Sequence, residues 1–420
     1  MLKLTLLLVQ LGTILLVARL VGLLFKRINQ PQVVGEMVAG ILLGPSFLGW
    51  LSPQTMAALF PVDSLAFLNA FGQLGLLIFM FLVGLNLDSK LLKSQSHTAV
   101  LTSHVSIVVP FFLGSLLALY LFPRLSDESV TFLGFALFMG AAMSVTAFPV
   151  LARILSERDM LGSKIGTVAI ACAAVDDVTA WTILAFIVVL VRTSAQHGSL
   201  LVNVLMTVAY ALIMILVVRR LLVWLETRHR VRGKFTHNMI AFVLLLVLAS
   251  SAMTEWLGIH TLFGAFLVGA IMPKDRNFVR DLNDKLEGLP VILLLPLFFT
   301  STGLRTSINL VSGAEMWFYC ALIIIIATVG KLGASMLSSR LSGMSWREAA
   351  SIGVLMNTRG LMELVILNIG LDIGVISPAL FSMMVLMAIV TTFMTSPLLQ
   401  LLWRDQAAAK EVLIAKEQLA

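Results

Sequence analysis

Most of the chain consists of apolar stretches of about 20 residues, separated by short segments that carry the charged side chains. Wound as an α-helix, a stretch of that length crosses the roughly 30 Å hydrocarbon core of a lipid bilayer. Of the 420 residues, 59% are hydrophobic and only 12% are charged. A water-soluble fold cannot bury so large an apolar fraction, because too much of its surface stays in contact with water. The sequence therefore predicts an all-α polytopic membrane protein whose solvent is the lipid bilayer.

We predict thirteen transmembrane helices. In chain order they are expected at residues 3–25, 32–50, 64–86, 99–121, 130–155, 164–191, 199–224, 236–257, 259–273, 287–304, 315–339, 347–371 and 378–402. The first stretch lacks the basic segment and small-residue cleavage site of a secretory signal, so we expect it to remain as a span. The segments between spans are too short for a soluble domain. Residues 1–420 are therefore expected to form one membrane unit, ending in a short cytoplasmic tail at 404–420.

The distribution of charge predicts the orientation of the chain. Its net charge is +7, and the segments after odd-numbered spans hold most of the Lys and Arg residues, as at Arg228, Arg230, Arg232 and Lys234. Because cytoplasmic loops are enriched in these residues, we expect the N-terminus outside and the C-terminus in the cytoplasm. No basic run is interleaved with aromatic residues, so the charge does not indicate nucleic-acid binding.

Two pairs of similar segments indicate an internal repeat. Residues Gly35–Gly40 are similar to Gly264–Gly269, and Phe79–Leu85 are similar to Phe298–Leu304. Both pairs are offset by seven spans, an odd number, so the second copy lies inverted in the membrane. The pattern predicts two inverted six-helix repeats joined by a linker helix at 199–224.

The sixth predicted span contains two adjacent acidic residues, Asp176 and Asp177, near its centre. Ionisable side chains inside a membrane are unfavourable, which makes them candidates for a functional site. Adjacent helix positions differ by about 100° in direction, so one carboxylate can meet a basic partner while the other faces a water-filled cavity. In the alternative interpretation the pair only anchors helices through hydrogen bonds.

A basic partner for this pair is available in the eleventh span. Lys331 follows a long apolar run and lies nine residues before Arg340, roughly 13 Å along a helix. Its side chain either extends to the cytoplasmic interface or pairs with an aspartate inside the protein. Because 13 Å is far for such an extension, and because Gly330 and Gly333 permit close helix contact, the sequence favours buried pairing.

Two predicted spans are interrupted near their centres. Pro149 in the fifth span leaves the carbonyl of Val145 without its helix donor, and Asn357–Gly360 interrupts the twelfth. The two spans are seven apart and are therefore repeat partners. Interrupted helices at matching positions indicate an ion site, because their free ends lie at the middle of the membrane. A proline kink without any ligand role is the alternative for the fifth span.

Four side chains near these interruptions are candidates for the site. The hydroxyls of Thr146 and Ser144 are the oxygen ligands that a monovalent cation such as Na⁺ or K⁺ would take. Arg359 and Glu363 are expected to balance the dipoles of the facing half-helices instead of contacting the ion.

The remaining polar residues in or near the predicted spans are not expected to bind the ion. Glu36 and Gln73 either line an access route or join helices, Glu255 and His260 are expected at the membrane interface, and Arg305 is expected as an external loop charge. The two cysteines, Cys172 and Cys320, lie in predicted spans and are expected as buried free thiols. No cofactor is expected.

These motifs resemble those of the monovalent cation:proton antiporter-2 family. The segments that carry the resemblance are Pro31–Pro45, Thr146–Pro149, the Asp176–Asp177 pair, Lys331 and Asn357–Leu364. Within that family the chain is similar to NapA-like Na⁺/H⁺ antiporters, to plant cation/H⁺ exchangers, and to the membrane domain of glutathione-gated K⁺ efflux systems. The resemblance implies an NhaA/NapA-like fold in which two broken helices cross.

The resemblance also implies a homodimer that works as an elevator. Residues 1–95 and 236–310 would form a dimer and gate domain, and 96–192 and 315–403 an ion-carrying core that moves against it. No nucleotide-binding domain is expected in this chain.

The resemblance implies a role for each site residue. Asp177 would bind the cation or a proton in turn, Asp176 would pair with Lys331, and Thr146 would lie beside the site. An Asp–Asp pair resembles the electrogenic members of the family. Na⁺ is the first expectation for the cation, with K⁺ or Li⁺ open, and the expected role is pH homeostasis in a bacterial inner membrane.

Two other classes of membrane protein are alternatives to a cation/H⁺ antiporter. An intramembrane aspartyl protease needs its two aspartates on different helices, whereas Asp176 and Asp177 are neighbours, so we do not expect an enzyme. A K⁺-selective exchanger, a channel-like efflux relative or a Na⁺:solute symporter is the remaining alternative, although a buried Lys331 disfavours a simple cation pore.

Overall fold

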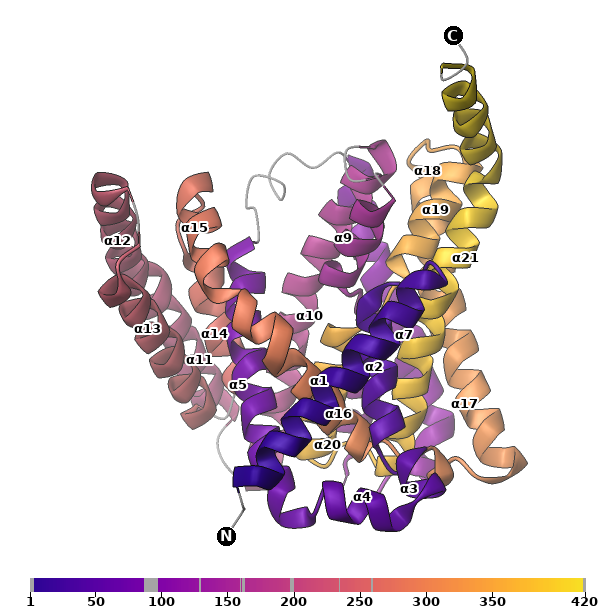
Figure 1. Ribbon diagram of the computed structural model, residues 1–420. Helices are drawn as coiled ribbons and strands as arrows, with labels where there is room; N and C mark the ends of the chain where they lie inside the picture. The colour runs from indigo at the N-terminus through magenta and orange to yellow at the C-terminus, as the bar shows by residue number, and fades with distance from the viewer. Residues whose placement is uncertain are drawn as a thin grey trace.

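The structure is a computed structural model, and it describes residues 4–86, 97–127, 130–158, 160, 163–196, 200–233, 235–257 and 260–417. Within these ranges the regular structure is entirely helical (Figure 1). The α-helices are α1 (Leu4–Arg27), α2 (Gln32–Leu43), α3 (Leu48–Leu51), α4 (Pro53–Leu59), α5 (Val62–Asn86), α7 (His97–Leu125), α8 (Phe132–Ser144), α9 (Phe148–Glu157), α10 (Lys164–Gln196), α11 (Leu200–Ile213), α12 (Arg219–Arg232), α13 (His237–Trp256), α14 (Thr261–Ile271), α15 (Arg276–Leu286), α16 (Leu295–Arg305), α17 (Gly313–Thr328), α18 (Ala334–Leu341), α19 (Trp346–Met356), α20 (Leu361–Asp372) and α21 (Pro378–Glu417). Three π-helical turns, η1 (Met214–Val218), η2 (Pro290–Leu294) and η4 (Val329–Gly333), continue neighbouring helices, and η3 (Ile308–Leu310) is a 3₁₀ turn.

Ten helices in the described ranges are long and apolar enough to cross a membrane, or eleven if α19 and α20, bent by 41° at their break, form one span. The two other predicted spans, 130–155 and 259–273, correspond to α8 with α9 and to α14, whose apolar helices are too short to pass the same length criterion. The integral membrane character is therefore established, and the number thirteen stays a prediction.

Two helix boundaries differ from the expected ones. The predicted linker ends at 224, but the helix formed by α11, η1 and α12 continues to Arg232, so Arg228 and Arg230 lie on a helix and not in a loop. Likewise, α21 continues to Glu417 through most of the expected tail. Hydropathy detects where a chain leaves the membrane, but polar segments form helices as readily as loops.

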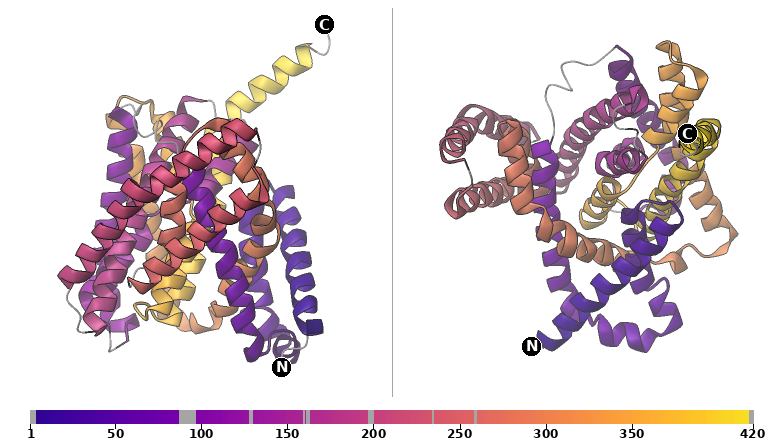
Figure 2. Two further views of the ribbon diagram at one scale, coloured as in Figure 1. Left: turned by 90° about the vertical axis from the view of Figure 1, so that its left-hand side faces the viewer. Right: turned by 45° about the horizontal axis from the view of Figure 1, so that its top comes forward.

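The helices fall into two packed groups. In the first, α2 packs on α1 and α16, α5 packs on α14 and α16, and α13 packs on α14. In the second, α7 contacts α8, α10, α17 and α18, while α21 packs against α17, α19 and α20. Helices α11, α12 and α13 lie at one edge of the molecule (Figures 1 and 2).

Glycines permit two close helix crossings in the first group. A Cβ at Gly40 of α2 would lie 2.2 Å from the Phe299 carbonyl oxygen of α16, and one at Gly269 of α14 would lie 2.1 Å from the Phe81 carbonyl oxygen of α5. Any side chain at these positions would push the backbones apart. Gly40 and Gly269 are equivalent in the first repeated motif, so each copy of that motif packs on the helix that carries the second motif. The crosswise packing supports the repeat, which remains a prediction.

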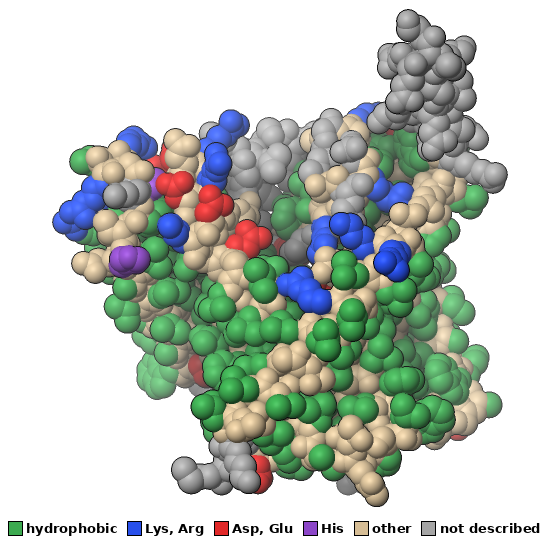
Figure 3. Space-filling model, in the orientation of Figure 1, with side chains coloured by type: hydrophobic (Ala, Val, Ile, Leu, Met, Phe, Trp, Pro, Cys, Tyr) green, Lys and Arg blue, Asp and Glu red, His purple; other side chains and the backbone are tan. Residues whose placement is uncertain are grey.

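The surface separates charged from apolar side chains. On the face in Figure 3, Lys and Arg gather toward the end that holds the C-terminus, and apolar side chains cover the region below. Exposed large apolar residues, such as Leu20, Val62, Phe112 and Ile325, fit a lipid-facing surface.

Candidate functional site

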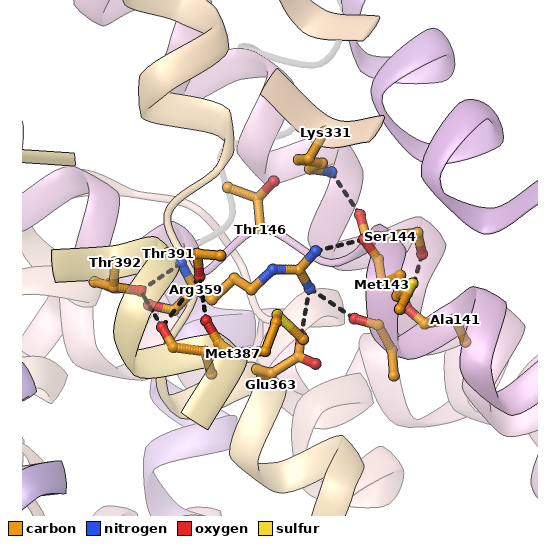
Figure 4. A network of polar contacts seen from close by, with 12 residues as sticks. Ala141, Met143, Ser144, Thr146, Lys331, Arg359, Glu363, Met387, Thr391 and Thr392 are labelled. Carbon is orange, nitrogen blue, oxygen red and sulfur yellow. Dashed lines mark hydrogen bonds and ion pairs between the residues drawn. The ribbon is translucent and has the colours of Figure 1, made fainter. Parts of the chain in front are cut away.

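The two interrupted helices cross, with their extended segments in direct contact. The first interruption separates α8 from α9, and the second separates α19 from α20 (Figure 4). The backbone N–H of Ala147 donates to the carbonyl of Thr358 at 2.9 Å. The Thr146 hydroxyl lies 2.9 Å from the Met356 carbonyl oxygen. These contacts satisfy backbone groups that would otherwise be unpaired inside a membrane.

A buried ion pair lies beside this crossing. Lys331 Nζ is 2.7 Å from Asp176 Oδ2, and neither side chain is exposed. Asp176 comes from α10, while Lys331 lies in the π-helical turn η4 between α17 and α18. The structure therefore brings the two residues together as expected from the sequence, and Asp176 is the aspartate that Lys331 contacts.

The carboxylate of Asp176 is surrounded by hydroxyl donors. Ser103 Oγ lies 3.1 Å from Oδ1, Ser106 Oγ lies 3.2 Å from each oxygen, and Thr146 Oγ1 lies 2.9 Å from Oδ2. Since Thr146 has one hydroxyl proton, it serves either Asp176 or Met356 at a time. Ser103 and Ser106 of α7 were not identified from the sequence. Their one signal is the i, i+3 spacing, which places both on one face of an apolar helix.

Asp177 differs from the adjacent Asp176 in its hydrogen bonding. Its side chain is fully buried, and neither carboxylate oxygen has a hydrogen-bond partner within the described part of the chain. The backbone N–H of Phe148, the first residue of α9, approaches the carboxylate without meeting hydrogen-bond geometry. An N-terminal helix end carries a partial positive charge that favours an anion. Asp177 is thus a buried carboxylate near the N-terminal end of α9 that has no hydrogen-bond partner among the described residues.

Lys331 also contacts two backbone carbonyls. Its ammonium lies 2.9 Å from the carbonyl oxygen of Ser106 and 2.5 Å from that of Ser144. The Ser144 hydroxyl, expected as a cation ligand, instead donates to the carbonyl of Ala141 at 2.8 Å in its own helix. Ser144 therefore presents a backbone oxygen to the site, because α8 ends at this residue and its last carbonyls lack helix donors.

Arg359 binds the same end of α8. Its Nη1 donates to the Ala142 carbonyl at 2.8 Å and to Glu363 Oε2 at 2.9 Å, and its Nη2 donates to the Met143 carbonyl at 2.6 Å (Figure 4). Glu363 lies in the first turn of α20. A cation at a helix C-terminus and an anion at a helix N-terminus are the arrangement that dipole balance requires. The dipole-balancing role expected for both residues stays a prediction.

Thr392 of α21 supports the second interruption and was also missed. Its Oγ1 accepts from the Arg359 backbone N–H at 2.9 Å, and it lies 2.6 Å from the Arg359 carbonyl oxygen. Threonine is common in apolar spans, so no local signal distinguishes Thr392 from the others.

The remaining polar candidates lie away from the ion pair. Glu36 is buried in α2, 3.9 Å from Arg19. Glu255 accepts from the Thr261 backbone N–H at 3.2 Å. Both cysteines are buried free thiols, as expected.

Arg305 requires a correction. It was expected as an external loop charge, but it ends α16 and forms an ion pair with Asp372 of α20. It also donates to Asn368 Oδ1 at 2.9 Å and, with Gln73 and His260, lines a cavity of about 20 Å³ between the helix groups. Its partner lies 67 residues further along the chain, so local sequence did not reveal the pair.

Crossed, interrupted helices around buried charges are the architecture of secondary membrane transporters. Comparison with known proteins agrees: residues 13–403 match the family described as "Sodium/hydrogen exchanger, transmembrane". The chain belongs to this family of transporters, which confirms the resemblance drawn from the motifs.

Similar proteins include the Na(+)/H(+) antiporter NhaS4 of Synechocystis sp., 42% identical over 397 residues, 94% of this chain and 97% of that protein. Cation/H(+) antiporter 17 of Arabidopsis thaliana is 41% identical, covering 94% of this chain and 48% of that protein. K(+)/H(+) antiporter 1 of Saccharomyces cerevisiae is 35% identical, covering 96% and 47%. The chain therefore spans about half the length of these plant and yeast relatives.

Among solved structures, the sodium proton antiporter MjNhaP1 from Methanocaldococcus jannaschii superposes with a TM-score of 0.64. The match covers 95% of this chain and 97% of that chain at 15% identity, so it supports the fold alone.

Proposed function

We propose that this protein exchanges a monovalent cation for H⁺ across a membrane, with cation and proton competing for the Asp177 carboxylate. One observation carries the proposal: Asp177 is fully buried at the helix crossing, and its oxygens have no partner among the described residues. An ionised carboxylate in such a place is unfavourable by several kcal/mol unless a counter-ion or a proton neutralises it. Two neutral forms are available, one protonated and one with a bound cation.

In the cation-bound form, oxygen atoms around the crossing replace water around the ion. Asp177 supplies the charge, and the Thr146 hydroxyl of the interrupted span, which lies 2.9 Å from the neighbouring Asp176, is proposed as a further ligand. In the proton-bound form the site is neutral without metal. Because either neutral form can cross the bilayer while the ionised empty form cannot, transport of one ion is coupled to the return of the other.

The Asp176–Lys331 pair gives the exchange its charge balance. We propose that Asp176 leaves Lys331 when the cation arrives and returns when the proton replaces it. If Lys331 releases a proton at that step, two protons move per cation and the exchange is electrogenic. Each net charge then couples to the membrane potential with about 2.3 kcal/mol per 100 mV.

The two packed helix groups are suited to an elevator motion. The proposed gate domain comprises residues 1–95 and 236–310, and the proposed core comprises 96–192 and 315–403. The carboxylates, Lys331 and both interruptions belong to the core, so its displacement would carry the site from one side to the other. We further propose that the protein has thirteen spans in two inverted repeats and forms a homodimer. Its N-terminus would lie outside, and its location would be a bacterial inner membrane.

The relatives make both Na⁺ and K⁺ candidates for the transported cation. A Na(+)/H(+) antiporter is 42% identical over nearly the whole of both chains, which favours Na⁺, whereas a K(+)/H(+) antiporter is 35% identical. Li⁺ remains open, as does the alternative of a K⁺-selective exchanger. A Na⁺:solute symporter is the second candidate, because a buried carboxylate with no fixed partner could also hold Na⁺ alone.

Proteoliposomes with a fixed pH gradient and a pH-sensitive dye test the proposal. Adding Na⁺, K⁺ or Li⁺ in turn should dissipate the gradient in the wild type, and Asp177→Asn should abolish the response to all three. Asp284→Asn, which alters an exposed carboxylate on α15, is the matched control and should respond as the wild type does. If correctly folded wild type responds to none of the cations, antiport is wrong and solute-dependent Na⁺ uptake becomes the next measurement.

A further inference from the structure

Helix α7 contains a proline at the level of the buried ion pair. Pro110 is buried in the middle of α7, whereas a second proline, Pro123, is exposed near its end. Proline has no backbone N–H, so the carbonyl four residues earlier loses its helix donor. For Pro110 that carbonyl belongs to Ser106. Inside a membrane, a carbonyl without a donor has to find one from another part of the protein.

The donor that the Ser106 carbonyl finds is Lys331. The distance from Lys331 Nζ to Ser106 O is 2.9 Å, and both residues are fully buried. The hydroxyl of the same serine contacts both oxygens of Asp176 at 3.2 Å. The backbone carbonyl of Ser106 therefore accepts from the ammonium. The Ser106 hydroxyl, which has one proton, lies within reach of both the carboxylate of the ion pair and, at 2.8 Å, the Ser103 carbonyl.

The packing between α7 and η4 allows this contact. A Cβ at Gly330 would lie 3.4 Å from Pro110 Cα, an ordinary contact distance, and 3.0 Å from the flexible Leu113 Cδ1, so the turn that carries Lys331 packs closely against α7 at the proline. The π-helical turn η4 begins at Val329 and includes Lys331. Such turns insert an extra residue and thereby change the direction of the side chains they carry.

We infer that Pro110 is a positioning residue for cation–proton exchange, because it frees the Ser106 carbonyl to hold the Lys331 ammonium. The inference rests on the proposed function. The ammonium has one charged acceptor, Asp176, and two neutral acceptors, the carbonyls of Ser106 and Ser144. When Asp176 turns to a cation, the two carbonyls keep the Lys331 amino group hydrogen-bonded whether or not it has released a proton, so cation binding does not leave an unpartnered donor in the membrane interior.

The alternative explanation is mechanical: the proline ring only bends α7, and the contact with Lys331 has no effect on exchange. The two explanations differ in which chemical group at position 110 matters. The inference assigns the effect to the missing N–H, and the alternative assigns it to the ring.

Pro110→Ala separates them when it is compared with two controls. Alanine restores the N–H, which then competes with Lys331 for the Ser106 carbonyl. The α-hydroxy analogue of alanine at position 110, introduced as a backbone ester, removes both the ring and the N–H. Pro123→Ala makes the same substitution elsewhere in α7. Exchange is measured in proteoliposomes as a function of cation concentration, together with the thermal stability of each variant.

For Pro110→Ala we expect the KM for the cation to rise about tenfold, equivalent to about 1.4 kcal/mol, with kcat changed less than twofold. The ester variant and Pro123→Ala should keep the wild-type KM. An unchanged KM in Pro110→Ala, or an ester variant that behaves like Pro110→Ala, would overturn the inference. Pro110→Gly also restores the N–H and serves as the second variant if alanine impairs folding.

The same assay distinguishes failure of the inference from failure of the proposed function. Wild-type exchange that is lost in Asp177→Asn, together with an unchanged Pro110→Ala, overturns the positioning role alone. Absence of exchange in the wild type overturns the proposed function, and the positioning role with it.

Discussion

The two interrupted helices use carboxylates in opposite ways. At the second interruption, Glu363 lies in the first turn of α20 and pairs with Arg359 of the same segment, four residues earlier. At the first interruption, the carboxylate near the start of α9 is Asp177, which comes from another helix and has no hydrogen-bond partner in the described ranges. One half of the crossing carries a buried ion pair, in which Glu363 Oε1 and Arg359 Nε have no further partner among the described residues, and the other half carries an unpaired carboxylate.

This difference indicates a division of labour. A closed, buried pair holds its surroundings in place, since breaking it would expose an uncompensated charge. An available carboxylate can change partner without breaking an existing hydrogen bond, which is what ion exchange requires. The crossing therefore combines a fixed half with an exchangeable half, and the variants below test whether the two halves differ in this way.

The largest change in stability is expected for Arg359→Gln. The substitution leaves Glu363 unpaired and removes donors from the carbonyls of Ala142 and Met143, so we expect a loss of about 3–5 kcal/mol. Thermal unfolding in detergent, followed by size-exclusion chromatography, measures it. Arg276→Gln on the exposed surface of α15 is the control. The double variant Arg359→Leu/Glu363→Leu should recover part of the lost stability. Equal losses for Arg359→Gln and Arg276→Gln would contradict the fixed half of the crossing.

A smaller loss of stability is expected for Thr392→Val, which keeps the side-chain shape but removes the acceptor for the Arg359 N–H. Hydrogen bonds between membrane helices contribute about 0.6 kcal/mol on average and at most about 1.7, so the loss should fall in that range. Thr391→Val is a close control, because the Thr391 hydroxyl donates only within its own helix, to Met387 and Ala388. Similar losses in both variants would show that Thr392 does not support the interruption.

The ion pair between Arg305 and Asp372 is expected to contribute less, because both side chains are about one-third exposed, at 31% and 35%. Asp372→Asn should lower stability by about 0.2–1 kcal/mol, and less at high ionic strength. Choline chloride should set the ionic strength, since Na⁺ and K⁺ are proposed substrates. Asp63→Asn, at an exposed carboxylate of α5, is the control. A loss of several kcal/mol would show that this pair stabilises the protein as strongly as the buried pair in the fixed half of the crossing.

Asp177→Asn should change stability least and exchange most. No hydrogen bond to Asp177 is lost, so the melting temperature should not fall, although the proposed exchange should disappear. By contrast, Asp176→Asn weakens the contact with Lys331 and should lower the melting temperature clearly. A fall in stability for Asp177→Asn as large as that for Asp176→Asn would remove the distinction between available and paired charge.

The parts of the site that were predicted are those that a bilayer makes conspicuous. Asp176, Asp177 and Lys331 stand out because ionisable residues are rare inside spans. The interruptions at Pro149 and at Asn357–Gly360 stand out because they disrupt a continuous helix pattern. None of these signals depends on knowing the neighbouring helices.

Residues whose importance comes from a distant partner were missed. Ser103, Ser106 and Thr392 are ordinary side chains in apolar helices, and only their contacts distinguish them. The Ser144 hydroxyl was expected to face the ion, but it turns to its own helix and leaves the carbonyl to Lys331. Arg305 was expected in a loop because it follows the tenth predicted span, and its partner Asp372 lies too far along the chain for local sequence to reveal the pair.

The sequence alone determined that this chain is an all-helical membrane protein of the cation/H⁺ antiporter family, with two adjacent carboxylates and two interrupted helices. Hydropathy, rare charges and helix-breaking residues are local properties, so they can be recognised from the sequence without knowing the neighbouring helices. The tertiary structure decided which hydroxyls surround Asp176, which backbone carbonyls Arg359 and Lys331 bind, and which carbonyl Pro110 makes available to Lys331. Those features depend on directions and distances between segments up to 225 residues apart, which helix packing sets.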